Sequence, residues 1–227
     1  MLVVGGIVAW WMSQNPTDVY RFRLVVEVEV DGAVRSGSSV IEVRVTHQTV
    51  GLPESKGWRS RISGEAVFVD LGGGRNVIAL LASGPNAENV DFPSQIVPEH
   101  FGPSYSQDLS KFSSQKGQWD LSGRTLPTFV TFIDVNDPRT ARVVRPEGFE
   151  RVLGQGVSYK RTYVEIVSPG TWPFNELGWP QTLIDEPVTR GIEGELPWLI
   201  RMKTEGLSGR IETSPGQFIV NVPYFTR

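Results

Sequence analysis

Hydrophobic and polar residues alternate along the chain from Tyr20 onward, and this pattern predicts a half-buried β-strand. Five apolar side chains fall on one face of that strand, with arginine and glutamate mostly on the other; they are Phe22, Leu24, Val26, Val28 and Val30. Asp31 and Gly32 follow directly, a pair suited to a tight hairpin turn, and alternation resumes over residues 34–46. The sequence therefore predicts a first β-hairpin.

Further strands follow at short intervals. Residues 59–70 and 76–82 have β-type composition on either side of a glycine-rich loop at 71–75, which predicts a second strand pair. Residues 129–135 predict a strand buried on both faces, and residues 157–167 predict another. Two more strands are expected near 209–213 and 217–224.

The predicted helices are few and short. Residues 83–127 form an irregular insert with possible helical turns near 94–101 and 106–114. Pro146 and Gly154 bracket a helix of one or two turns, and residues 187–200 could hold another, with Thr189 near its N-cap and a break at Pro197. Hairpin-linked strands with so little helix predict a mainly β protein, an antiparallel β-sandwich or open barrel, with residues 17–227 forming one domain.

The first residues have a different character. Residues 2–12 are an unbroken apolar run, and a helix of that length spans about 16 Å against about 30 Å of hydrocarbon. The run has the size of a signal-peptide core but has no basic residue before it and no cleavage pattern at residues 13–16. We interpret residues 1–16 as an anchor or signal-like segment. On this interpretation the chain binds the membrane through residues 2–12. The alternative is a buried N-terminal strand or an arm packed on the domain. An inner-membrane anchor would place the rest of the chain in the periplasm.

Composition excludes several classes of protein. The 227 residues include 22 Lys and Arg against 25 Asp and Glu, a net charge of −3, which argues against nucleic acid as a partner. The absence of cysteine removes disulfide scaffolds, thiol nucleophiles, zinc ribbons and iron–sulfur clusters.

Motifs for catalysis or metal binding are incomplete. The two histidines, His47 and His100, form no metal-binding pair, and no GxSxG elbow is present. His100 is the better candidate for a site because it lies in the long insert. Asp134 to Asp137 resemble the start of a calcium loop, but Pro138 interrupts it, and a turn capped by its own side chains is the favoured interpretation. No metal or cofactor is predicted.

Two further sets of residues could form a site. A carboxylate pair would need acids facing each other across a cleft, and five acids are available for it: Asp134, Asp137, Asp185, Glu186 and Glu193. An aromatic and proline-rich cluster contains Trp172, Phe174 and Trp179, which could stack on a ligand or, alternatively, fill a core or cover a sheet edge. With His100, these three residues are the candidate ligand-binding set.

Several short strings resemble a set of uncharacterised proteins from Gram-negative bacteria. The strings are YRFRL at 20–24, SGSSVIEV at 36–43, GEAV at 64–67, DVNDP at 134–138, PVTRGIE at 187–193 and LPWL at 196–199. Those proteins typically begin with a hydrophobic segment. The resemblance implies a location in the cell envelope and no particular reaction, cofactor or catalytic residue.

Three functions are compatible with these observations. The favoured one is a membrane-anchored periplasmic β-domain that acts as a non-catalytic binding or structural protein, with an envelope protein as a possible partner. The second is a metal-independent hydrolase that uses a carboxylate pair or His100. The third is a β-barrel binder of an apolar ligand, with Phe22, Leu24 and Phe68 lining an internal cavity. The sequence predicts no oligomeric state.

Overall fold

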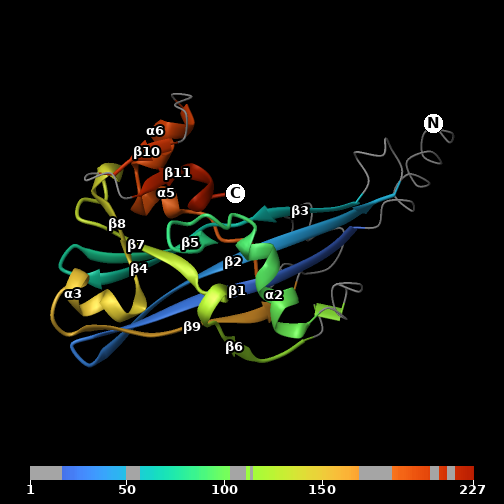
Figure 1. Ribbon diagram of the computed structural model, residues 1–227, viewed down its shortest axis with the longest axis horizontal. Helices are drawn as coiled ribbons and strands as arrows, with labels where there is room; N and C mark the ends of the chain where they lie inside the picture. The colour runs from blue at the N-terminus through green and yellow to red at the C-terminus, as the bar shows by residue number, and fades with distance from the viewer. Residues whose placement is uncertain are drawn as a thin grey trace.

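Two antiparallel sheets pack together and form the body of the protein (Figure 1). The computed structural model describes residues 17–49, 57–102, 111–112, 115–168, 186–204, 210–213 and 218–227. The first sheet has the order β3 (Gly57–Ser63), β2 (Ala33–Gln48), β1 (Thr17–Val30), β9 (Val157–Val167) and β6 (Gln118–Asp120). The second has the order β4 (Val67–Gly72), β5 (Arg75–Ser83), β7 (Pro127–Phe132) and β8 (Ala141–Val144). The predicted mainly β, sandwich-like class is confirmed, and the described strands close no barrel.

The first hairpin forms as the alternation predicts. The apolar face of β1 packs into the core between the sheets, with Phe22, Leu24, Val26 and Val28 fully buried. Asp31 and Gly32 both adopt positive φ, 50° and 80°, which is the geometry of a two-residue turn that follows the twist of the strands. Val30 therefore pairs directly with Ala33, and the whole of β2 is set in register by this turn.

The second predicted strand pair is partly wrong. Residues 59–70 do not form one strand: β3 pairs with β2 in the first sheet, while β4 pairs with β5 in the second. The chain changes sheets at Gly64, whose φ of +155° disfavours other residues and whose missing side chain leaves room for Ile41. The sequence has β-type composition on both sides of this corner, so composition alone could not locate it.

A second core lies on the other face of the second sheet. β7 is buried along its whole length, as predicted, although it ends at Phe132, and Ile133 is exposed. The covering layer consists of α5 (Ile192–Glu195), α6 (Trp198–Thr204), the β10–β11 hairpin (Arg210–Glu212 and Ile219–Asn221) and a 3₁₀ turn (Val222–Tyr224). Phe68 packs here while Phe22 and Leu24 lie in the first core, so the three residues line no common cavity.

The predicted irregular insert at residues 83–127 contains short elements. They are α2 (Phe92–Phe101), β6 and a 3₁₀ turn (Gly123–Thr125). The helical turn expected at 94–101 lies within α2, whereas most of the one expected at 106–114 falls outside the described residues. Tyr20 of β1 reaches α2, where its hydroxyl donates to the carbonyl of Ser94 at 3.2 Å.

The remaining short helices include one correction. Two 3₁₀ turns (Pro138–Thr140 and Pro146–Gly148) flank β8, and α3 (Phe149–Leu153) ends at Gly154 as predicted. The chain also breaks at Pro197, between α5 and α6. Thr189 is not an N-cap, because α5 begins after Gly191. Instead the Thr189 hydroxyl accepts a hydrogen bond from the backbone N–H of Val40 at 2.8 Å and joins this segment to β2.

Candidate functional site

A cleft of about 860 Å³ runs beside β8, one of the two outer strands of the second sheet. All four residues of β8 line it. Arg151 and Val152 of α3 contribute on one side, and Thr213 and Phe218 of the C-terminal layer on another. The cleft therefore lies where the sheet edge, a short helix and the covering layer meet.

Local sequence explains why β8 is short. Asp137 accepts a hydrogen bond from the backbone N–H of Arg139 at 3.0 Å and so caps the turn that leads into the strand. Pro146 begins the next turn after Arg145, which ends the strand. Among the described strands β8 pairs only with β7. No other described strand pairs with its second edge, so within the described residues the backbone N–H and C=O groups there can bond to an added strand.

Three arginines surround this free edge. Arg142, Arg145 and Arg151 line the cleft with exposed side chains, and none forms an ion pair with any described residue. Glu147 is the acidic residue of the lining. Three guanidinium groups against one carboxylate give the cleft a net positive charge in a protein whose overall net charge is −3.

A smaller, more apolar hollow adjoins the cleft. Its volume is about 370 Å³, and it shares Val143, Val144 and Arg145 with the larger cleft. Leu126 and Pro146, both half-buried, supply apolar surface there. The combined groove thus offers backbone hydrogen-bonding groups, positive charge and an apolar wall, which together suit a segment of peptide.

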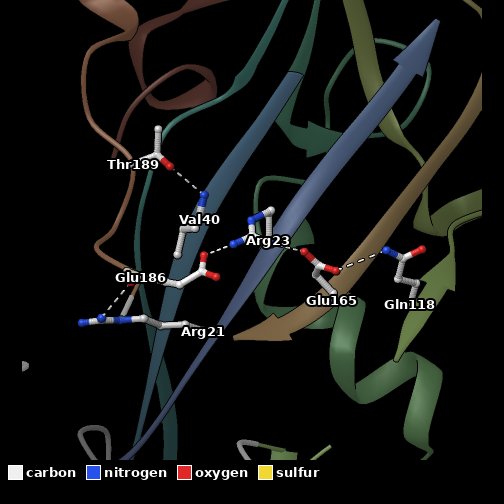
Figure 2. A network of polar contacts seen from close by, with 7 residues as sticks. All are labelled: Arg21, Arg23, Val40, Gln118, Glu165, Glu186 and Thr189. Carbon is white, nitrogen blue, oxygen red and sulfur yellow. Dashed lines mark hydrogen bonds and ion pairs between the residues drawn. The ribbon is translucent and has the colours of Figure 1, made fainter. Parts of the chain in front are cut away.

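A second polar cluster, on the outer face of the first sheet, is internally compensated (Figure 2). Arg23 of β1 forms ion pairs with Glu165 of β9 and with Glu186, and Gln118 donates to Glu165 at 3.4 Å. Arg21 donates to the carbonyl of Glu186 at 3.2 Å. Burial lowers the pKa of Arg23, but its bonds and charge attraction to Glu186 and Glu165 outweigh this and hold that pKa above its usual value. The cluster fixes residues 186–189 to the sheet.

The two clusters differ in how far the charges of their arginines are compensated by described residues. In the first-sheet cluster each arginine has a carboxylate partner, and Arg21 also binds Glu42 at 2.7 Å. In the cleft the three arginines have no such partner among the described residues. Guanidinium groups bind carboxylates or phosphates through paired hydrogen bonds, so the cleft has unused capacity for an anionic ligand.

Of the candidate ligand-binding residues, only His100 falls among the described residues; Trp172, Phe174 and Trp179 lie outside them. His100 is exposed in the last turn of α2, with its ring 5.3 Å from that of Trp119 and 4.9 Å from that of Phe101. Neither cleft contains it. Among the described residues, the rings nearest His100 are those of Phe101 and Trp119, which are aromatic.

The acids considered for a carboxylate pair have other partners. Asp134 accepts the backbone N–H of Asn136 at 2.9 Å, and Asp137 accepts that of Arg139, so the interpretation of this stretch as a self-capped turn is confirmed. Glu186 binds Arg23, and Glu193 binds Lys203. Asp185 lies outside the described residues, within which no group of three histidines or acids is placed to hold a metal ion.

Sequence reasoning missed the cleft, although one signal was present. Between Pro138 and Pro146, every third residue is an arginine: Arg139, Arg142 and Arg145. Ala141 and Val143 are apolar and flank Arg142. A four-residue strand between two proline-initiated turns is too short to show convincing alternation, and Arg151 joins the group only through the packing of α3.

Comparisons of the chain with protein-family models, with curated proteins and with solved structures found no match. Within the residues that the structure describes, no helix has the length and hydrophobicity needed to cross a bilayer. The predicted anchor at residues 2–12 lies outside those residues.

Proposed function

We propose that this protein is a membrane-tethered, periplasmic and non-catalytic binding domain whose cleft takes up an extended acidic segment of a partner protein. The observation that carries the proposal is the placement of Arg142, Arg145 and Arg151, all without ion pairs to described residues, around the free edge of β8.

The chemistry of the groove favours a peptide over a small molecule. An extended peptide can bind along a sheet edge through main-chain hydrogen bonds, while its side chains select the sequence. Glutamate or aspartate side chains on such a peptide would meet the arginines, and an apolar side chain would meet Leu126 and Pro146. Complementary charge of this kind gives specificity and a fast encounter.

The position of the cleft suits a tethered domain. β1 runs for 14 residues from Thr17 to Val30, a length of about 45 Å. The cleft lies toward the Val30 end, because α3 directly precedes β9, whose first residue Val157 pairs with Val30. Figure 1 places α3 and β8 at the end of the molecule away from the start of β1. A membrane at the Thr17 end would leave the cleft open to a partner.

Peptide binding tests the proposal directly. A fluorescently labelled peptide of alternating valine and glutamate should bind the full chain in detergent, measured by fluorescence anisotropy, whereas a valine–lysine peptide of the same length should not. Replacing all three arginines (Arg142→Gln, Arg145→Gln, Arg151→Gln) should weaken binding of the acidic peptide by about a hundredfold, since each lost charge contact costs at least about 1 kcal/mol.

Two controls define what the result means. Arg35→Gln with Lys160→Gln changes two charges outside the cleft and should leave the affinity unchanged. A peptide with N-methylated backbone amides should bind more weakly if the segment adds to β8 as a strand. Equal binding of acidic and basic peptides, or no effect of the triple substitution, would refute the proposed function.

The tether and its location need a separate measurement. Membrane fractionation of cells that express the full chain, with protease added from the periplasmic side, should give a membrane-bound protein that is digested. Recovery of the intact protein in the cytosolic fraction would contradict both the anchor and the periplasmic location.

A further inference from the structure

An exposed tryptophan marks the end of the first sheet at which β1 begins. The side chain of Trp58 in β3 is 56% exposed, although its ring lies flat on that of His47 across the strand pair. The two ring centroids are 4.4 Å apart, with an angle of 12° between the ring planes. This stacking holds a large apolar surface in a fixed position facing solvent.

Two uncompensated arginines lie on the same strand as Trp58 but on the opposite face of the sheet, because successive side chains of a strand alternate between its faces. Arg59 and Arg61 are exposed on β3, an outer strand of the sheet, and neither forms an ion pair with a described residue. Arg61 lies opposite Arg44, whose guanidinium binds Glu42 at 3.1 Å. We refer to His47 and Trp58 on one face of this sheet end, with Arg59 and Arg61 on the other, as the strand-end patch. Its charge at neutral pH is positive.

The strand-end patch lies close to the point where the chain leaves the hydrophobic segment. Thr17 pairs with Thr46, and Thr46 pairs with Arg59. Two steps between neighbouring strands place the backbone of Arg59 about 10 Å from that of Thr17. Only residues 13–16 separate Thr17 from the apolar run, and a chain of that length reaches at most about 17 Å.

We infer that the strand-end patch binds the anionic headgroups of a phospholipid bilayer and forms a second membrane contact beside the tether. Arginine forms paired hydrogen bonds with phosphate, and tryptophan is favoured where hydrocarbon meets water. This inference rests on the proposed tether, because a short link to an embedded segment would press this end of the sheet toward the membrane surface. The domain would then have a fixed orientation, with the strand-end patch toward the bilayer and the cleft away from it.

Vesicle binding by the full chain tests the inference. Partitioning is measured by flotation with vesicles of phosphatidylcholine and with vesicles that also contain phosphatidylglycerol. The wild-type chain should favour the anionic vesicles by roughly tenfold or more, since each basic residue near such a surface contributes about 1 kcal/mol. Arg59→Gln with Arg61→Gln should abolish that preference while binding to neutral vesicles persists. Arg59→Lys with Arg61→Lys should retain most of it.

A matched control removes the same charge elsewhere on the sheet. Arg35 pairs with Val28 near the hairpin turn, and Lys160 of β9 follows Tyr159, which also pairs with Val28, so Arg35→Gln with Lys160→Gln should keep the anionic preference. Equal loss in both double variants, or no loss at Arg59 and Arg61, would overturn the inference. Anionic preference without any binding to neutral vesicles would instead refute the tether and leave the patch supported. Peptide binding at the cleft is measured separately and does not depend on either outcome.

Discussion

Glu27 and Arg161 face each other on neighbouring strands of the first sheet and are joined by two hydrogen bonds. Nε and Nη2 of Arg161 donate to the two carboxylate oxygens of Glu27 at 3.0 and 3.1 Å, and Lys160 lies 3.8 Å away. The hydrogen bonds from Arg161 are the main cause that lowers the pKa of Glu27, which burial alone would raise. The pair links β1 to β9 just where the register shifts.

Because of this pair, we expect the stability of the folded chain to depend on pH. Because the pKa of Glu27 is lower in the folded chain than in the unfolded one, its contribution is complete above the unfolded value of about 4.3. That contribution is lost as the pH falls through the folded pKa. Glu27→Gln should therefore unfold at a lower temperature than wild type at pH 7, and the difference should vanish in strong acid. The difference should be small, because solvent screens the exposed guanidinium.

Thermal unfolding followed by circular dichroism across this pH range checks the prediction. Glu29→Gln is a suitable control, since Glu29 is exposed on the same strand. A Glu27→Gln difference that stays constant from neutral to acidic pH would show that the carboxylate charge has no part in it.

The hydrogen bonds between Thr189 and Val40 should contribute to the free energy of unfolding. Its hydroxyl accepts the Val40 backbone N–H at 2.8 Å, and its own N–H donates to the Val40 carbonyl at 3.1 Å. Thr189→Val keeps the shape and the backbone bond but leaves the Val40 N–H without its acceptor, which should cost about 1 to 2 kcal/mol of unfolding free energy. Thr189→Ser should restore most of it. Urea denaturation of the three chains gives the comparison, and equal stability of valine and serine variants would contradict it.

A substitution at Asn76 should lower the free energy of unfolding more than Thr189→Val does. Its buried amide group both donates to the carbonyl of Phe132 and accepts from the N–H of Phe132, each at 2.9 Å. Asn76→Asp can still accept but places a carboxylate against the Phe132 carbonyl, so it should destabilise the fold by about 2 to 4 kcal/mol at pH 7. The loss should diminish in acid, where the protonated carboxyl can donate again. Denaturation at neutral and acidic pH measures this, and an unchanged loss in acid would argue against the polar explanation.

The parts of the fold that could be predicted from the sequence are those set by local chemistry. The β1–β2 hairpin follows from alternation and from Asp31 and Gly32, which tolerate positive φ. The corner at Gly64 and the pairing of β3 depend on contacts between distant residues, which period-two patterning does not encode. The same holds for the cleft: Arg151 meets Arg142 and Arg145 only because α3 packs near β8. His100, chosen for its place in a long insert, lies elsewhere, among aromatic rings.

Gly37 gives the sharpest structural prediction, because it marks where β2 meets β4. A Cβ atom at this position would lie 2.2 Å from the carbonyl oxygen of Phe68, a backbone atom that cannot move without shifting the strand. Gly37→Ala should therefore cost roughly 3 kcal/mol or more of unfolding free energy through overpacking at the junction of the two sheets. The neighbouring Ser38→Ala adds no atom and should cost less than about 1 kcal/mol. Urea denaturation of both variants measures the difference, and similar stabilities would mean that β2 and β4 are not held at this distance.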